Sequence, residues 1–191
     1  MVVSGLALGC DTAAHEGCVQ SRGITVAVLA HRVDYVYLAT NRKLASSIID
    51  GSGALVSEYA PGTKPRSSYF VERDRVQSAF SLGVIIVETD VEGGTMHTAG
   101  FAVKQKRRLA CLVHPPKFAS AEKARGNQKL IKEADAFPLE KKEDLDAFIA
   151  YCFLERLRSR NSQLNLRTDQ SSLRNNAIYS LAGNKCKFRA C

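Results

Sequence analysis

Apolar runs alternate with segments of helical periodicity along the first 140 residues of this chain. Continuous aliphatic and β-branched runs are typical of strands that are covered on both faces. Such runs occur at residues 1–3, 25–29, 54–57, 84–87 and 109–113, and a weaker one at 136–138 predicts an edge strand. Apolar residues recurring every three or four positions predict helices up to residue 22 and at 41–49, 72–81, 96–106 and 126–132. The alternation predicts an α/β, doubly wound fold: a mostly parallel sheet with helices on both faces.

The C-terminal segment has a different character. Residues 144–157 predict an amphipathic helix, whose apolar side either packs back on the sheet or forms a dimer contact. That side carries Leu145, Phe148, Ile149, Cys152 and Phe153. From Ser159 onward Ser, Asn, Gln and Arg dominate. We therefore expect one domain at 1–158 and a disordered or loosely packed basic tail at 159–191.

The charge of the chain is unevenly distributed. Overall, 27 basic and 19 acidic residues give a formal charge of +8. Residues 1–103 carry 8 basic and 10 acidic side chains, whereas residues 151–191 carry 8 and 2. A polyanionic partner is therefore compatible with the composition, although much of the excess lies in the predicted tail.

The 6 cysteines form no C-x-x-C pair and no Cys/His spacing suited to zinc. We read them as reduced thiols of a cytoplasmic protein and expect neither a metal nor a cofactor. No apolar run approaches the length of a membrane-spanning helix, so no membrane partner is expected.

Two glycine-containing turns lead from a predicted strand into a predicted helix. The first contains Gly5, Gly9 and Asp11, and the second contains Gly93 and Gly94, with Thr95 as the expected helix cap. The N–H groups at the start of a helix favour anions, so both turns are candidates for a phosphate or nucleotide pocket. The simpler reading is that any tight strand-to-helix connection uses glycine.

The predicted topology brings further residues to the same place. In a parallel sheet, ligands bind beyond the carboxyl ends of the strands. Glu58 and Glu88 follow two of these strands, and a long loop rich in Pro and Gly runs from Tyr59 toward Arg75. We therefore expect the glycine turns, both glutamates and this loop to lie at one edge of the sheet.

Taken together, these residues resemble the DNA-processing protein A (DprA/Smf) family, whose fold is Rossmann-like. The match runs in order from about residue 2 to residue 136. The motifs that carry the resemblance are Ser4-Gly5-Leu6-Ala7-x-Gly9-x-Asp11-x-Ala13-Ala14-His15, Asp34, Tyr37 and Asn41, Gly53-Ala54-Leu55-x-Ser57-Glu58-Tyr59-x-Pro61-Gly62-Thr63-x-Pro65, Phe70-x-x-Arg73-x-Arg75, Glu88, Gly94 with Thr98-Ala99, and Gly126-Asn127-x-x-Leu130-Ile131.

The resemblance implies a protein that binds single-stranded DNA, dimerises and helps to load a RecA-type recombinase during natural transformation or recombination. The positions that match the family's DNA pocket are Phe70, Arg73 and Arg75, with Arg66 as a nearby candidate. Arginine neutralises backbone phosphates, and an aromatic ring stacks on a base without reading its sequence. The structural alternatives are that Phe70 fills the core and that Arg73 or Arg75 forms an ion pair with Glu58 or Glu88.

The chain departs from the family pattern in several places, including Ala30-His31-Arg32 and His114-Pro115-Pro116, and two further departures bear directly on the DNA pocket. Asp74 stands between the two arginines where the family usually has asparagine. The chain also begins at what resembles the family's second strand, so the family's first strand and its Gly-Ser-Arg turn are not present in this sequence.

Two other functions compete with DNA binding. An enzyme of the LOG type, which releases the base from a nucleoside monophosphate, would need a catalytic glutamate after the second glycine turn. That glutamate is not found in the sequence, so we expect no enzymatic activity; His97 is the available substitute. The third reading is a nucleotide-binding module without catalysis.

Overall fold

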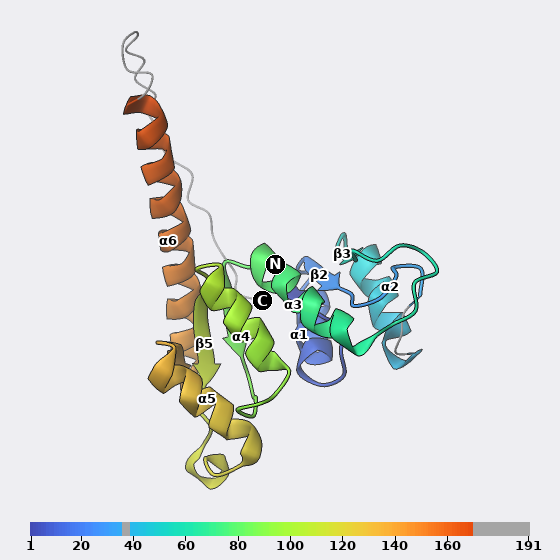
Figure 1. The fold of residues 1–191 in the computed structure, drawn as a ribbon, viewed down its shortest axis with the longest axis horizontal. Coiled ribbons are helices and arrows are strands. Elements are labelled where there is room, and N and C mark those ends of the chain that lie inside the picture. Colours follow the sequence, from blue (N-terminus) through green and yellow to red (C-terminus); the bar gives the residue numbers. More distant parts are fainter. Residues whose placement is uncertain (36–38, 170–191) are drawn as a thin grey trace.

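The computed structural model describes residues 1–35 and 39–169, with side chains described through residue 160. Figure 1 shows two bodies joined by the helix α3 (Ser67–Phe80). The strands are β1 (Val2–Ser4), β2 (Thr25–Val28), β3 (Ala54–Val56), β4 (Gly83–Ile86), β5 (Arg108–Leu112) and β6 (Phe137–Leu139). The other helices are α1 (Cys10–Gln20), α2 (Arg42–Asp50), α4 (Thr95–Lys104), α5 (Glu122–Glu133) and α6 (Lys142–Asp169), with 3-10 turns at Ala39–Asn41 and Pro116–Phe118.

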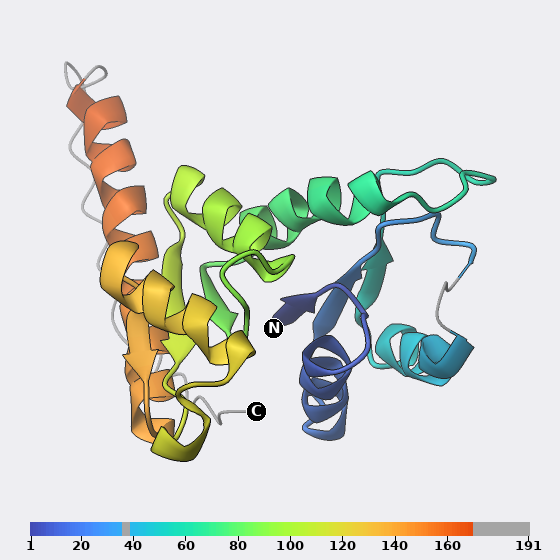
Figure 2. The same cartoon turned by 60° about the horizontal axis from the view of Figure 1, so that its bottom comes forward.

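The strands form two parallel sheets of three, in the orders β1-β2-β3 and β4-β5-β6. Val3 pairs with Val26 in the first sheet, and Ile86 pairs with Cys111 in the second. The predicted α/β class with parallel strands and covering helices is confirmed. The expectation of a single sheet is corrected, because β1 and β4 are inner edges that do not pair with each other (Figure 2).

The helix α3 connects the two sheets. It packs against α4 in the second body and also contacts β1 and β2 in the first. This helix begins five residues earlier than predicted, directly after Pro65 and Arg66, because that part of the loop continues into its first turn. Arg73 and Arg75 consequently lie in the middle of the helix and not near its start.

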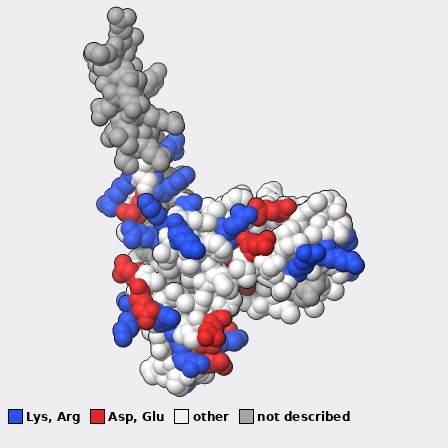
Figure 3. Space-filling view, viewed as in Figure 1, with Lys and Arg blue, Asp and Glu red and all other residues white. Residues whose placement is uncertain are grey.

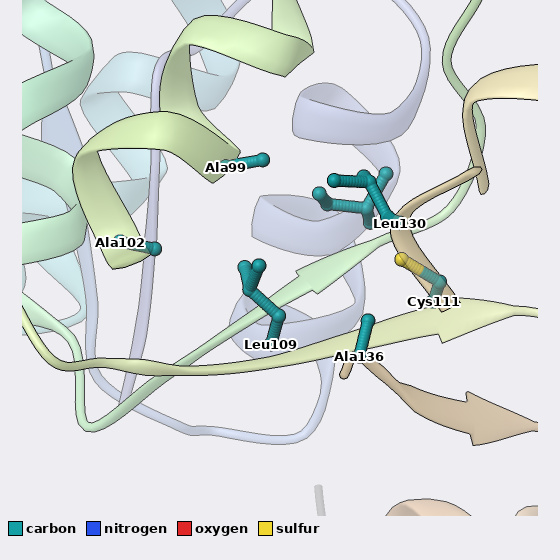
Figure 4. Close-up of a cluster of buried hydrophobic side chains, with 7 residues drawn as sticks. Ala99, Ala102, Leu109, Cys111, Leu130 and Ala136 are labelled. Carbon is teal, nitrogen blue, oxygen red and sulfur yellow. The ribbon is translucent and has the colours of Figure 1, made fainter. Parts of the chain in front are cut away.

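Each sheet has its own core. In the second body α4 and α5 cover one face, and Figure 4 shows Ala99 and Ala102 of α4 on the side of β5 that carries Leu109. The other face is covered by α6, through Phe148 and Cys152. In the first body Ala27, Leu29 and Ile48 are among the buried residues of a separate cluster.

The helix α6 is longer than predicted. It continues to Asp169, beyond the predicted helix end at Leu157. Backbone hydrogen bonds inside a helix do not require an apolar face, so the polar composition after Leu157 does not end the helix. Phe148 and Cys152 pack on the sheet, whereas Ile149 and Phe153 on the same predicted side are exposed. The segment 170–191, including Cys186 and Cys191, and Tyr37 of the quoted motif lie outside the described residues.

Within the described part of the chain, no helix is both long enough and apolar enough to cross a membrane.

Candidate functional site

The first glycine turn is organised by the carboxylate of Asp11. Ser4 Oγ donates to Asp11 Oδ1 at 2.6 Å, and the N–H groups of Gly5 and Ala7 donate to Asp11 Oδ2 at 3.0 and 3.1 Å. Gly9 has a φ of 90°, which favours glycine at that position. Gly5, Gly9 and Asp11 therefore meet in one turn, as predicted, but two of its N–H groups already bind a carboxylate.

Arg73 is buried beside this turn. It exposes only 7% of its surface. Its Nη1 donates to the carbonyl oxygens of Gly5 at 3.0 Å and Val28 at 2.6 Å, and its Nε donates to Asp74 Oδ1 at 3.1 Å. The guanidinium thus holds the carboxyl ends of β1 and β2 together.

Asp74 connects the turn to the second body. Its carboxylate pairs with Arg73 and accepts a hydrogen bond from the hydroxyl of Thr98 in α4. Burial raises the pKa of Asp74, against the opposing effects of Arg73 and Thr98. The residue that separates the two arginines in the sequence is therefore a buried partner of one of them.

Arg75 faces the opposite way from Arg73 and forms an ion pair with Glu58. Its Nη2 lies 2.8 and 2.7 Å from the two carboxylate oxygens. About half of each side chain is exposed, at 49% for Arg75 and 46% for Glu58. The ion-pair alternative is therefore confirmed for Arg75 with Glu58, whereas the acidic partner of Arg73 is Asp74.

The loop after β3 and the first turn of α3 present aromatic and basic side chains together. Phe70 is 36% exposed, and the Arg73 guanidinium carbon lies 6.0 Å from the centre of its ring. Arg66 is exposed and lies 5.9 Å from the centre of the Tyr69 ring, which in turn stacks on Tyr59. Phe70 does not fill the core, and the sequence analysis did not single out Tyr69.

The second glycine turn belongs to the other body and is internally packed. Gly93 N donates to the Asp90 carbonyl at 3.1 Å, and a Cβ on Gly93 would lie 2.6 Å from Thr89 Oγ1. Gly94 is the N-cap of α4, so Thr95 is its first helical residue and not the cap. Glu88 pairs with Lys123 at 3.5 Å, away from the Glu58–Arg75 pair.

Asn127 holds the strand ends of the second sheet, a role the sequence analysis did not assign. It is 1% exposed, and its Nδ2 donates to the carbonyl oxygens of Val87 and Leu112, each at 2.9 Å. These two residues end or follow β4 and β5. The signal in the sequence was the Gly126-Asn127 pair, which carries part of the family resemblance but was given no role.

Basic and acidic side chains are interspersed on the face drawn in Figure 3, with basic groups along the α6 side and at the far end of the first body. Among the described residues, no group of three or more His, Cys, Asp and Glu is placed to hold a metal ion. The four described cysteines, Cys10, Cys18, Cys111 and Cys152, are free thiols.

The model of the DNA recombination-mediator protein A family matches residues 1–150. The chain belongs to this family. The Smf protein of Escherichia coli (strain K12) is 33% identical over 145 residues, which cover 76% of this chain and 38% of that protein. DNA processing protein DprA of Streptococcus pneumoniae (strain ATCC BAA-255 / R6) is 36% identical over 107 residues, covering 56% of this chain and 38% of that protein.

Solved structures of family members have the same fold. The X-ray structure of DNA processing protein A from Streptococcus pneumoniae is 31% identical, with a TM-score of 0.67 over 77% of this chain and 50% of that one. The protein from Helicobacter pylori, whose structure is described for its single-stranded DNA binding mode, is 25% identical, with a TM-score of 0.65 over 78% and 64%. The present family member thus spans 38% of the length of the two curated relatives named above.

Proposed function

We propose that this chain binds single-stranded DNA in DNA processing, through Arg66 and Phe70 at the start of α3. The observation that carries the proposal is the exposure of a guanidinium at the N-cap of α3 and of an aromatic ring in its first turn, beyond the carboxyl end of β3. An exposed ring takes up a base, and a nearby arginine neutralises a phosphate. The description of the Helicobacter pylori relative as a protein that binds single-stranded DNA supports the proposal.

The four basic and aromatic positions have different roles in this proposal. Arg66 and Phe70 contact DNA directly, and Arg75 does so after it exchanges the Glu58 carboxylate for a phosphate. Arg73 acts indirectly, because its guanidinium is buried and bound to the carbonyls of Gly5 and Val28. It fixes the loop side of α3 relative to the first glycine turn.

We further propose that the protein hands its DNA to a RecA-type recombinase and acts as a homodimer, as the family resemblance implies. The exposed apolar residues of α6 leave a helix face for such a contact: Ile149, Phe153, Leu154 and Leu157. Light scattering at micromolar concentration tests the dimer, since a monomer throughout would contradict it.

The proposal is a binding function and not base release from a nucleotide. The first turn of α4 carries no acidic residue, and Glu92 precedes the glycines instead of following them. Incubation with nucleoside monophosphates and detection of free base checks this point, because any enzyme-dependent release would overturn it.

The test of DNA binding is the salt dependence of affinity for a fluorescent oligo-dT, measured by anisotropy with the full chain. Each phosphate contact on a single strand contributes about 0.7 to the slope of log affinity against log salt. Arg66→Ala should reduce the slope by about that amount, and Phe70→Ala should weaken binding by about 1–3 kcal/mol without changing the slope. Lys132→Ala, an exposed lysine near the C-terminal end of α5, is the matched control. No binding by the wild-type chain at low salt would overturn the proposal.

A further inference from the structure

Two tyrosines form a stacked pair at the start of α3. Tyr59 comes from the loop after β3, and Tyr69 comes from the first turn of the helix. Their ring centres lie 4.1 Å apart with an interplanar angle of 23°. Both residues are partly exposed, so the pair lies at the surface of the loop.

Tyr59 is held in place by several contacts. Its backbone N–H donates to Ser57 Oγ at 3.0 Å, and its hydroxyl lies 3.3 Å from Glu72 Oε2. Burial, followed by the charge of Glu72, raises the pKa of Tyr59 to about 12, so the ring stays neutral at physiological pH. Tyr59 is therefore a fixed support against which Tyr69 lies.

Tyr69 and Phe70 present rings to different sides of α3. Consecutive residues of a helix are about 100° apart around its axis. Tyr69 lies against Tyr59 on the side of the β3 loop, whereas Phe70 lies on the side of Arg73, which binds the ends of β1 and β2. The start of α3 thus offers two aromatic surfaces, with the guanidinium of Arg66 near the first of them.

We propose that Tyr69, supported by Tyr59, is a second base-stacking position beside Phe70, so that the start of α3 takes up two neighbouring nucleotides of a single strand. Arg66 neutralises the phosphate at the Tyr69 position. The inference rests on the proposed function and adds a binding residue to it. Stacked rings suit a base because every base has a π-face, and such contacts tolerate any sequence.

The pair could instead serve only to fix the start of the helix, and three substitutions separate the two roles. Tyr69→Phe keeps the ring, Tyr69→Leu keeps apolar packing without a π-system, and Tyr69→Ala removes both. Affinity for a fluorescent ten-residue oligo-dT is measured by anisotropy with the full chain, and thermal unfolding of each variant is followed by circular dichroism.

If Tyr69 stacks on a base, Tyr69→Phe binds like the wild type, while Tyr69→Leu and Tyr69→Ala bind about 5- to 100-fold more weakly with an unchanged salt slope. Tyr151→Ala should bind like the wild type. This control removes another partly exposed tyrosine beside an arginine, since Arg108 lies 5.0 Å from the centre of the Tyr151 ring on α6.

An oligonucleotide with abasic positions gives an independent readout. A second abasic site next to the first should weaken wild-type binding further, but should have little added effect on Tyr69→Ala, because the contact is already lost. If Tyr69 only fixes the start of the helix, the second abasic site should weaken binding by the same factor in the wild type and in Tyr69→Ala.

The outcomes distinguish this inference from the proposed function. If the wild type binds single strands and Tyr69→Leu binds them with the same affinity, the stacking role alone is overturned. The stacking role is also overturned if Tyr69→Leu loses affinity only to the extent that it loses thermal stability, and if abasic sites do not weaken the binding of the wild type more than that of Tyr69→Ala. Failure of the wild-type chain to bind any single strand overturns both.

Discussion

The guanidinium of Arg73 donates to the carbonyl oxygen of Gly5 at 3.0 Å and fills the space next to the Cα of that glycine. A Cβ at position 5 would lie 2.6 Å from Arg73 Cζ, closer than side-chain carbons normally approach. Glycine at this position is therefore required by the buried arginine. In this structure the first glycine turn serves to fix α3.

Gly5→Ala should lower the free energy of unfolding by about 3 kcal/mol, because the methyl group displaces a buried charged group from its hydrogen bonds. Urea denaturation measures the change. Gly17→Ala is the control: Gly17 is exposed in α1 with open space around it, and alanine there should stabilise by up to about 1 kcal/mol. Equal stability of Gly5→Ala and the wild type would show that Arg73 is not anchored at this turn.

Asn127→Leu should destabilise the second sheet, because it leaves the carbonyls of Val87 and Leu112 without this donor. A buried acceptor without a partner costs about 1–3 kcal/mol. The loss should appear in thermal unfolding, whereas Lys129→Ala, at an exposed position on the same helix, should change stability by less than about 0.5 kcal/mol. A loss no greater than that of the control would contradict the role of Asn127.

His15 should make stability depend on pH. The residue is fully buried; its Nδ1 lies 2.7 Å from Thr25 Oγ1, and its Nε2 has no partner among the described groups. Burial lowers the pKa of His15 below 6.5. The unfolded chain therefore binds the proton first, and stability falls as pH drops below about 6.5, by up to about 1.4 kcal/mol per pH unit.

Replacement by leucine isolates this effect. The free energies of unfolding of the wild type and of His15→Leu are measured by urea denaturation at several pH values. Between pH 7 and pH 5, the wild type should lose stability relative to His15→Leu. The other titratable groups are common to both proteins and cancel in the difference. A constant difference over this range would mean that His15 has the same pKa in the folded and the unfolded chain.

Hydrophobic periodicity was enough to predict the fold class and the order of its elements, since every strand except β6 contains a short aliphatic run. It could not show that β1 and β4 remain unpaired, because pairing depends on which edges meet in space. The burial of Arg73 was not predicted either, because the family resemblance identified this residue only by its place in the motif. Residues two apart in a helix point about 200° apart, so Arg73 and Arg75 cannot both face one ligand. The sequence alone shows that spacing. Which of the two arginines is buried depends on contacts with Gly5 and Val28, which are far away in the sequence.

The edge of β4 with which no described strand pairs should promote association of chains. The strand is wholly apolar apart from Gly83, and Ile85 at its centre is 43% exposed. Edge strands without charges are templates for pairing with other chains. Ile85→Lys should therefore reduce light scattering on concentration or heating. Val103→Lys, at an exposed position on α4, should leave light scattering unchanged. An equal reduction by both substitutions would indicate a simple gain in solubility.

Glu58→Gln should strengthen binding to single-stranded DNA. The change removes the carboxylate that pairs with Arg75, and an exposed pair of this kind contributes only about 0–1 kcal/mol to stability, so folding is preserved. The freed guanidinium can then meet a phosphate, which adds about 0.7 to the salt slope for oligo-dT. Arg75→Ala in the Glu58→Gln background should remove that gain. Glu155→Gln is the control, because it makes the same change of net charge but frees Arg108 and also Arg158 of α6. If the salt slope rises equally in both variants, the gain comes from net charge, and Arg75 has no special place in the interface.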